Sequence, residues 1–441
     1  AFRREEPAVP PQPQSREEAR RYWAMPWLAQ LSERNPLTMS RWVLLWTLVG
    51  AAGGLFAALY WNVLELLTHA LETFTGPSLL FVMPLVGLAI GFVIYWLGNP
   101  GEIAVIVDNI HFQGGRLEMR RNPAMILSSL LSIAAGGSAG PEAPLVQVTG
   151  SLGTWVGDRL RLQSENLRTM SLVGMASGFT ALFGAPLGGA MFALEILHHQ
   201  HVAEYYEAVL PAIVASCASY IVFAGITHLG LAPTWQFPQY SLDNIDDFAL
   251  AILYGAVGAA AGWLLITIFR LCDQFFARLA GPIYVRTTIA GLGLGAIATV
   301  FPLTRFFGHH ELSVVITTEF TATALLALAC AKMVAISITV TGGWRGGFII
   351  PIFFTGTCIG KAIALLVPGI NPVLAMICTM AGMNAAVTRT PVSTALLLAK
   401  LTGVSTFTPV LFASLVGFFL APKVPLIASQ LKTNSGELAH P

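Results

Sequence analysis

The sequence predicts an all-α polytopic membrane protein that is made of two related halves and contains broken, half-spanning helices. Three observations carry this prediction. First, 55% of the 441 residues are hydrophobic and only 11% are charged, whereas soluble domains carry about 25% charged residues. Second, long apolar runs alternate with short apolar segments that Gly or Pro interrupts. Third, the order of these Gly and Pro residues is repeated in the second half of the chain.

Residues 1–41 form a polar tail that we expect on the cytoplasmic side of the cell's inner (plasma) membrane. The tail contains seven Arg and five Glu, and an excess of basic residues beside the first span is typical of cytoplasmic segments. Within it, Arg16–Leu31 is predicted as a possible amphipathic helix on the membrane surface. The formal net charge of +1 gives no reason to expect a nucleic-acid partner.

Residues 42–229 form the first predicted repeat. A helix needs about 20 apolar residues to span a bilayer, and three runs are long enough: Trp42–Leu67, Leu79–Leu97 and Glu207–Thr227. Four apolar segments are shorter, namely Pro123–Ala135, Leu145–Val156, Arg168–Leu182 and Pro186–Leu197. Interrupted backbone at membrane depth is tolerated only where protein buries it or where it lines a cavity. We therefore expect this region to line a site or a pathway.

The second predicted repeat covers residues 248–432, between an inter-repeat loop at 230–247 and a short tail at 433–441. Its expected spans are Phe248–Arg270, Thr287–Phe301 and Ala322–Val340. Short segments then return, as in the first repeat: Phe348–Val367, Val373–Thr388, Val392–Leu401 and Phe407–Leu420. The polar His309-His310-Glu311 triplet is expected to lie in a loop.

One carboxylate lies in the interrupted part of the first repeat. Glu142 stands between Pro141 and Pro144, and it is the one acid in residues 123–156. Because an acid at lipid depth is costly, Glu142 is a functional candidate by default. The alternative is a structural charge in a salt bridge, which we disfavour because no basic residue lies near Glu142 in the sequence.

The setting of Glu142 recurs in the second half. The matched pairs are Gly140 with Gly347, Pro144 with Pro351, and Gly153 with Gly360. Further along, Met175, Pro186 and Ala190 match Met380, Pro391 and Ala395. Paired Gly- and Pro-interrupted segments in the two halves of a transporter point to a binding site where the repeats meet.

The breaks themselves predict an anion site. A helix that begins inside the membrane directs free N–H groups and the positive end of its dipole at the pathway, and such an N-terminus binds anions. Breaks of this kind occur at Gly98–Gly101, Gly140–Pro144 and Gly346–Pro351, whereas a cation pathway would favour rings of carboxylates or carbonyls. Beside these N-termini, a charged Glu142 would compete with an anion, and a protonated Glu142 would leave with its proton. The sequence therefore predicts an anion pathway that protons gate or accompany.

These residues resemble the motifs of the CLC family of chloride channels and chloride/proton antiporters, of the prokaryotic type. The family's GxExP motif is similar to residues 140–144 (Gly-Pro-Glu-Ala-Pro), although the family usually has Arg or Lys at position 141 and Gly at position 143. Its GxFxP-type segment resembles Gly346–Pro351, where Ile349 takes the aromatic position and Phe348 precedes it. The resemblance covers about residues 40–432.

The resemblance implies an inverted repeat of two halves with many tilted, broken and half-spanning helices, and a homodimer with one pathway in each subunit. Glu142 then takes the role of the external gate and of the proton acceptor. The residues that would hold the anion are Gly98, Asn99, Gly140, Pro141, Gly347, Phe348, Ile349 and Ile427. Neither a cofactor nor a metal is implied.

Three departures from the family bear on the transported ion. Asn99 or its neighbour Gly98 stands where the family has a serine, and Asn99 is preferred because its amide can donate as a hydroxyl does. Ile427 stands where the family has a tyrosine. Ile196 follows Glu195 where antiporters often have a second glutamate. Glu195 is therefore a weak candidate for the proton pathway, and otherwise a charge at a helix end.

The main hypothesis is a chloride/proton antiporter gated by Glu142, whose partners are a small anion, protons and the lipid bilayer. A passive chloride channel of the same fold is an alternative that Ile196 favours. A fluoride/proton antiporter is another, because the fluoride-exporting branch of the family departs at the same positions. Arg345, just before the second break, is expected either at the inner mouth of the pathway or as an interfacial charge.

An enzyme is the least favoured hypothesis. An intramembrane enzyme with Glu142 as general acid would need a partner base or nucleophile, such as a Gly-x-Ser-x-Gly serine or a His-Glu-x-x-His motif. We expect neither motif, and we predict that the protein is not an enzyme. His198, His199 and His201 lack the i,i+4 spacing of a metal-binding pair, so we interpret them as a solvated cluster at the membrane interface.

Overall fold

The computed structural model describes residues 36–101, 116–162, 164–196, 202–238, 240, 244–403, 407–423 and 426. The chain divides into two compact units, Ala1–Leu45 and Trp46–Pro441, and the fold below is that of the second unit. Several predictions fall outside the described residues: the surface helix within residues 1–35, the cluster of His198, His199 and His201, Ile427, and the tail at 433–441.

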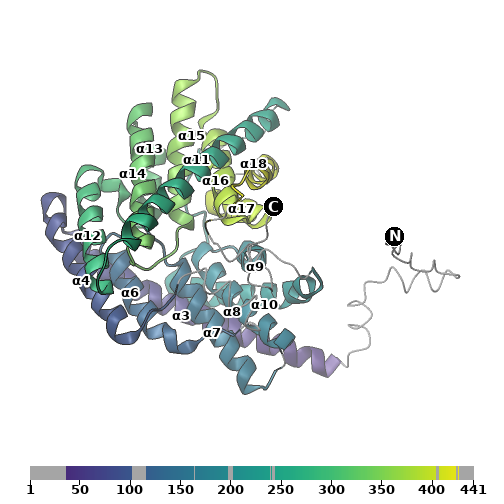
Figure 1. The fold of residues 1–441 in the computed structure, drawn as a ribbon. Helices are drawn as coiled ribbons and strands as arrows, with labels where there is room; N and C mark the ends of the chain where they lie inside the picture. The colour runs from purple at the N-terminus through teal and green to yellow at the C-terminus, as the bar shows by residue number, and fades with distance from the viewer. Residues whose placement is uncertain are drawn as a thin grey trace, which may run out of the picture. The chain divides into compact units, whose positions relative to one another are not determined.

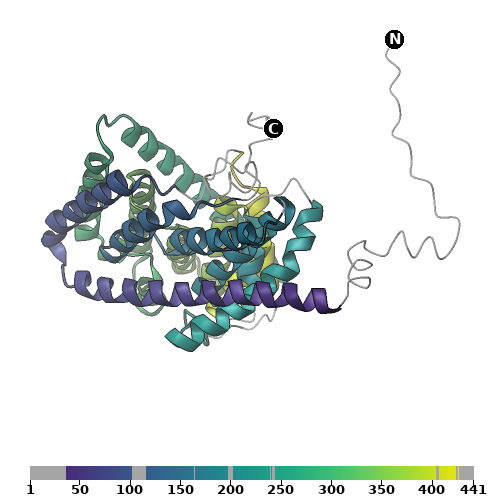
Figure 2. The ribbon, with the colours of Figure 1, turned by 90° about the horizontal axis from the view of Figure 1, so that it is seen from below.

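The regular elements of the described part are helices, apart from an isolated β-bridge between Gly140 and Gly347 (Figure 1). The first half contains α3 (Pro36–Glu72), η1 (Gly76–Ser78), α4 (Leu79–Leu97), η2 (Met119–Arg121), α6 (Asn122–Ala134), α7 (Glu142–Arg159), α8 (Ser164–Phe183), α9 (Pro186–Glu195) and α10 (Val202–Thr227). Figure 2 shows α3 as one long continuous helix. The three predicted spans of this half are confirmed as helices, and α3 and α10 extend beyond their apolar runs.

Two of the four short segments in this half are longer than the sequence predicted. α7 begins at Glu142 rather than at Leu145, since a proline in the first turn, here Pro144, removes no helical hydrogen bond. α8 has 20 residues, because the polar stretch Ser164–Leu167 continues the helix where the apolar pattern has already ended. By contrast, α6 with 13 residues and α9 with 10 residues are short, as predicted.

The second half repeats this organisation. It contains α11 (Asp246–Ala277), α12 (Ile283–Val300), η3 (Pro302–Thr304), α13 (His309–Thr317), α14 (Ala322–Thr341), α15 (Ile349–Leu366), α16 (Pro372–Thr388), α17 (Pro391–Thr402) and α18 (Phe407–Phe419). The expectation of a loop at His309-His310-Glu311 was wrong, because this triplet forms the first turn of α13. Gly308 precedes it at φ 98°, a left-handed conformation that glycine adopts without strain.

Seven of the described helices are long and apolar enough to cross a membrane, namely α3, α4, α10, α11, α12, α14 and α15. The inclusion of α15 corrects the prediction of a short segment there. Protein buries 72% of the apolar window of α15, against 33% to 50% in the other six. α15 is therefore a central helix, enclosed by its neighbours.

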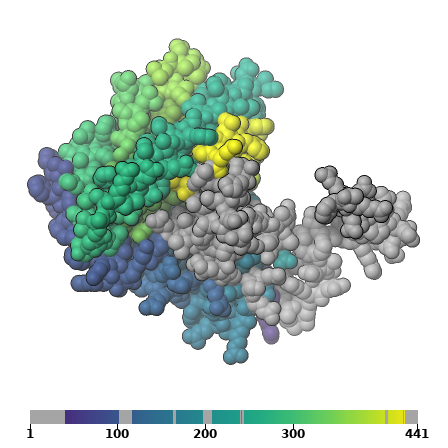
Figure 3. All heavy atoms as spheres, in the orientation of Figure 1, coloured from purple at the N-terminus to yellow at the C-terminus, as the bar shows by residue number. Residues whose placement is uncertain are grey.

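The outer helices present apolar side chains to their surroundings. α11 crosses the face seen in Figure 3, and its exposed side chains include Leu253, Trp263, Leu264, Leu271 and Phe275. A soluble protein rarely exposes so many large apolar groups on one element, whereas lipid tails solvate them. The chain is accordingly a multi-pass membrane protein, as its composition predicted.

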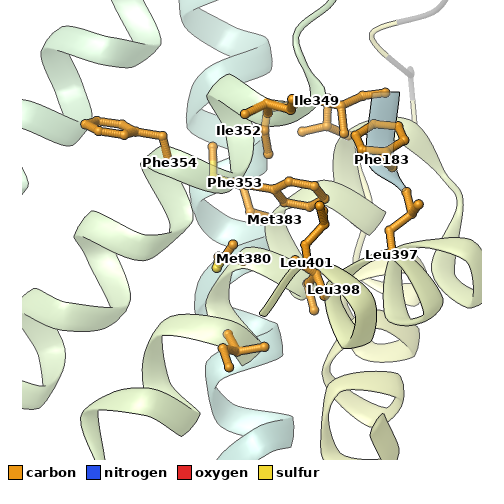
Figure 4. Packing of buried hydrophobic residues seen from close by; sticks show 14 of the residues in the cluster. Phe183, Ile349, Ile352, Phe353, Phe354, Met380, Met383, Leu397, Leu398 and Leu401 are labelled. Carbon is orange, nitrogen blue, oxygen red and sulfur yellow. The ribbon is translucent and has the colours of Figure 1, made fainter. Parts of the chain in front are cut away.

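Helices of the two halves pack against each other, and the start of α15 lies beside residues of the first half. α4 packs against α12, and α9 packs against α17, so that each pair joins a first-half helix to a second-half helix. Figure 4 shows the start of α15, where Ile349 lies beside Phe183 of α8 and Phe353 points toward Leu398 and Leu401 of α17. All five side chains are buried. This apolar packing fixes the N-terminus of α15 against elements of both halves.

Candidate functional site

The two breaks that the repeat pairs in sequence are also paired in space. Gly140 precedes α7, and Gly347 precedes α15. The N–H of Gly140 donates to the carbonyl of Gly347 over 2.7 Å, and the N–H of Gly347 donates to the carbonyl of Gly140 over 2.6 Å. Each of these N–H groups is therefore engaged with the carbonyl of the other glycine, and the glycines contribute space rather than free donors.

The space above the two glycines is filled by the carboxylate of Glu142. A Cβ atom built on Gly140 would lie 2.2 Å from Glu142 Oε2, and one built on Gly347 would lie 2.3 Å from the same oxygen. Both distances are far below van der Waals contact. Any residue other than glycine at either position would push the carboxylate away, so the paired glycines are what allows it to lie there.

Glu142 is fully buried at the N-terminus of α15. Its Oε1 accepts a hydrogen bond from the N–H of Ile350 over 3.0 Å, and the carboxylate also interacts with the N–H of Ile349. Its Oε2 has no hydrogen-bond partner among the described residues. A carboxylate thus stands where the first N–H groups of a helix converge, which is the position that an anion takes at such a terminus.

Three neighbouring candidates contribute backbone rather than side chain. Phe348 directly precedes α15, and Ile349 is its first residue, with both side chains buried. Their apolar side chains pack into the core, so only their N–H groups are suited to an anion. Pro141 precedes α7 and has no N–H to give; its carbonyl accepts from Leu145 over 3.1 Å.

The third break lies at the end of α4. Gly98 ends this helix at φ 90°, and its N–H donates to Ile94 over 3.0 Å. Asn99 Oδ1 accepts from the N–H of Gly101 over 3.1 Å and from Nη2 of Arg345 over 3.0 Å. The side-chain oxygen of Asn99 is thus occupied, and its amide group is the part that can donate to an anion.

Arg345 connects the break at Gly98–Gly101 with the break at Gly346–Pro351. It lies on the loop just before α15 and is 5% exposed, which excludes a solvated interfacial charge. Through Nη2 it holds Asn99, a residue 246 positions earlier in the sequence. The loop after α4 and the loop before α15 are therefore tied together by a buried guanidinium.

Glu195 lies at the end of α9 and is bound at a different helix start, that of α17. Its Oε1 accepts from the N–H of Val392 over 3.0 Å, and its Oε2 accepts from the N–H and the hydroxyl of Ser393 over 2.8 and 2.6 Å. These donors belong to the first turn of α17. The geometry favours the predicted helix-end charge, and the adjoining Ile196 is buried.

The segment before Glu142 contains a Gly-x-Ser-x-Gly spacing at Gly136–Gly140, which the expectation of no nucleophile overlooked. In serine hydrolases this spacing presents a serine to a base. Here Ser138 is fully buried, and its hydroxyl has no hydrogen-bond partner among the described residues. No base therefore activates Ser138 in this part of the chain.

Sequence reasoning missed two groups beside this site. Ile350 supplies the N–H that Glu142 accepts, and a backbone donor leaves no signal in residue type. Tyr60 of α3 is buried and forms a hydrogen bond with Ser129 of α6 over 2.8 Å. The available signal was one hydroxyl residue in each of two apolar segments. Taken singly, however, each segment indicates only a membrane helix and not a contact between the two hydroxyl groups.

The fold and this arrangement together define a class. Broken helices from two repeats of a multi-pass membrane protein meet at a buried carboxylate, which is the architecture of a membrane anion-transport protein. Residues 86–422 match the family described as voltage gated chloride channel. Because that match covers more than half of the chain, the chain belongs to this family, the CLC family whose motifs its sequence resembles.

Two relatives show how far the sequence likeness extends. A chloride/fluoride channel protein of Pseudomonas syringae pv. tomato is 26% identical over 341 residues, which cover 74% of this chain and 73% of that protein. A protein of Methanocaldococcus jannaschii is 26% identical over 381 residues, which cover 86% of this chain and 92% of that protein. The likeness thus extends over most of each protein.

Solved structures share the fold. A CLC-type fluoride/proton antiporter matches with a TM-score of 0.79 at 21% identity, over 90% of this chain and 99% of that chain. A slow cyanobacterial Cl⁻/H⁺ antiporter matches with a TM-score of 0.75 at 21% identity, over 86% of this chain and 94% of that chain. These matches confirm the predicted all-helical membrane architecture.

Proposed function

We propose that the chain is an anion/proton antiporter in which Glu142 is the protonatable external gate and chloride is the transported anion. The observation that carries the proposal is the position of the Glu142 carboxylate at the N-terminus of α15, on the N–H of Ile350. A charged carboxylate and a chloride ion are alternative occupants of that terminus, because both are anions attracted by the same N–H groups and helix dipole.

Protonation is what exchanges the two occupants. A neutral carboxylic acid gains little from the positive end of α15, so it leaves and an anion can take its place. When the acid loses its proton in a later step of the transport cycle, the carboxylate returns and displaces the anion. Each exchange moves a proton and an anion in opposite directions, which is antiport.

The loose attachment of Glu142 supports this role. Only one of its oxygens has a strong donor, and Oε2 is buried without a partner. A buried acceptor without a partner typically costs about 1–3 kcal/mol. The charged carboxylate is therefore held weakly enough for protonation or a competing anion to release it.

The other proposed anion contacts are the backbone around the breaks and one side chain. The N–H groups of Phe348 and Ile349 lie at the start of α15, and the amide of Asn99 would supply donors from the first half. Gly98, Gly140, Pro141 and Gly347 would shape the path without giving a free N–H. Glu195 remains the weaker proposal for the proton pathway, because three donors already hold it.

Two other functions remain as second candidates. A passive anion channel is favoured by the apolar Ile196 beside Glu195, since no second acid follows there to take the proton. Fluoride as the anion is favoured by Asn99 in place of a serine, and one relative is described as a chloride/fluoride channel protein.

Membership in the family supports three further proposals. We infer a homodimer with one pathway in each subunit, a place in the plasma membrane, and a cytoplasmic N-terminus. We also infer that residues 42–229 and 248–432 are the two inverted repeats, with 230–247 as their linker. The paired glycines at 140 and 347 support that repeat relation.

The deciding experiment is transport by the purified protein in sealed lipid vesicles. A chloride gradient is imposed without a pH gradient, and the pH inside the vesicles is recorded. Antiport predicts that chloride moves down its gradient and that protons move in the opposite direction. Anion flux without proton movement would support the channel instead. Repeating the assay with fluoride, bromide and nitrate identifies the preferred anion.

The role of Asn99 is tested in the same assay. Asn99→Ala removes the amide donors, so we expect the preference among halides to change by roughly two- to tenfold, the size of one hydrogen bond. Asn99→Ser is the matched variant, since it restores the hydroxyl typical of the family. If both variants keep the preferences of the unaltered protein, Asn99 does not contact the anion.

A further inference from the structure

A tyrosine–serine pair lies buried between α3 and α6. Tyr60 is 3% exposed, and its hydroxyl lies 2.8 Å from that of the fully buried Ser129. Tyr60 belongs to a buried apolar cluster that also includes Leu130 and Leu145. Burying two hydroxyl groups among apolar side chains is costly unless they bind each other or a further group.

The direction of the hydrogen bonds in this pair is determined by a third atom. Ser129 Oγ lies 3.1 Å from the carbonyl oxygen of Ile126, which can only accept. Because a serine has one proton, Ser129 donates to Ile126 and must accept from Tyr60. The Tyr60 oxygen therefore gives its own proton away and retains its capacity to accept another.

Two observations place this acceptor in the neighbourhood of Glu142. Tyr60 belongs to the same apolar cluster as Leu145, which follows Glu142 by three residues and so lies on the same face of α7. In addition, the charge of Glu142 acts on the Tyr60 hydroxyl.

Glu142 can supply a donor to Tyr60 in one of its two states only. A charged carboxylate accepts hydrogen bonds and has no proton to give, whereas a carboxylic acid has one O–H. In the charged state Oε1 is bound to Ile350 and Oε2 has no partner among the described residues. A protonated Oε2 is thus the group that matches the acceptor on Tyr60.

We propose that Tyr60, oriented by Ser129, is the positioning residue that receives Glu142 in its protonated state. The inference rests on the proposed function and gives the gate its second resting position. The carboxylate takes up one proton, leaves the N–H of Ile350, and its new O–H donates to Tyr60. The proton stays on Glu142 throughout, and no covalent bond of Tyr60 or Ser129 changes.

The pair discriminates between the two states of Glu142. Since Tyr60 donates its proton to Ser129, it has no donor for the charged form of Glu142. It can, however, accept a hydrogen bond from the protonated form. The charged side chain therefore has its better partner at α15, and the neutral side chain has its better partner at Tyr60. Such a device keeps the acid out of the anion position for as long as it is protonated.

The test is Tyr60→Phe in the full chain, reconstituted in vesicles and assayed for anion and proton flux over a series of pH values. The variant removes one hydrogen bond from the protonated gate, so we expect coupled turnover to fall by roughly two- to tenfold. The pH of half-maximal transport should move to lower pH by about half a unit to one unit, because more protons are needed to populate the acid.

Ser129→Ala is the second variant, and it keeps the tyrosine. Without Ser129, the Tyr60 proton is free to donate to the charged carboxylate. The variant is thus expected to shift the midpoint to lower pH by more than Tyr60→Phe does. When Tyr60→Phe is already present, Ser129→Ala should add no further shift.

Two controls separate positioning from a general structural effect. Tyr220→Phe removes a tyrosine hydroxyl that donates to the carbonyl of Gly230, and it should leave the pH midpoint unchanged. With Glu142→Ala, whose side chain can neither be protonated nor donate a hydrogen bond, Tyr60→Phe should have no effect on anion flux. An unshifted midpoint in both Tyr60→Phe and Ser129→Ala, while the unaltered protein couples protons, overturns the inference alone. Anion flux without protons in the unaltered protein overturns the proposed function and this inference with it.

Discussion

Glu142 and Glu195 are two acids of the first half that accept N–H groups at the start of a second-half helix. Glu142 does so at α15, through Ile350, and Glu195 does so at α17, through Val392 and Ser393. Both therefore join the repeats by the same chemistry, a carboxylate at the positive end of a helix.

The two acids differ in how completely their oxygens are satisfied. Glu195 has three donors within 3.0 Å that serve both of its oxygens, including the hydroxyl of Ser393. Glu142 has one strong donor on Oε1, and its Oε2 lies over Gly140 and Gly347 without a partner among the described residues. A fully bonded carboxylate is a fixed cap, whereas a partly bonded one can be exchanged for another anion.

The largest expected effect comes from Glu142→Gln. The amide can still lie near Ile350 but can neither carry a proton nor alternate between charged and neutral states. We expect proton movement in vesicles to fall to background while anion flux continues. Proton coupling that survives in this variant would show that Glu142 is not the acid that carries the proton.

Gly347→Ala should have the next largest effect. Its Cβ would lie 2.3 Å from Glu142 Oε2, and overpacking of this kind typically costs about 1–3 kcal/mol. The carboxylate should be displaced, and proton-independent anion flux should rise several-fold in the vesicle assay. Gly225→Ala is the matched control, because nothing lies within 4 Å of a Cβ at that position. Equal behaviour of the two alanine variants would contradict the role of the paired glycines.

Glu195→Gln tests the fixed member of the comparison. It keeps an acceptor for α17 but removes the charge, so we expect a loss of about 0.5–2 kcal/mol of stability, typical of a damaged helix cap. Thermal unfolding of the purified protein measures this loss. The ratio of protons to anions should stay unchanged. A collapse of coupling as complete as that of Glu142→Gln would instead place Glu195 on the proton pathway.

Ser393→Ala should have the smallest effect. It removes one of the three donors to Glu195 and leaves both backbone N–H groups in place, so we expect about 0.5–1.5 kcal/mol of lost stability. Val392→Ala serves as the control, because it keeps its backbone donor and trims a side chain that is 38% exposed. If the two variants unfold at the same temperature, the hydroxyl adds nothing to the cap.

The sequence predicted those parts of the fold that depend on apolar length and on Gly and Pro. Leu79–Leu97 was predicted to the residue, because both its ends are marked by helix-breaking residues. Gly140 and Gly347 were predicted only as equivalent positions of the repeat, and the structure brings them into direct contact. α13 was missed because its first turn is polar and its helical pattern covers only 9 residues.

Contacts between distant elements could not be predicted from the sequence. The cap that Ser393 forms with Glu195 joins residues 198 positions apart, and Tyr60 meets Ser129 across 69 positions. Neither pair has a local spacing that distinguishes it from other hydroxyl and acidic residues in apolar helices. Residue type indicated that Glu142 was costly to bury, but only the three-dimensional arrangement revealed which of its oxygens has a partner.

The reciprocal bonds between Gly140 and Gly347 have a consequence for the speed of the gate. They join the backbone just before α7 to the backbone just before α15. If Glu142 is the gate that we propose, its opening is then a rotation of the Glu142 side chain rather than a separation of the two halves. Side-chain rotations are faster than collective movements of whole domains, which take microseconds to milliseconds. We therefore expect the arrival of protons, and not the movement of protein, to set the pace of transport.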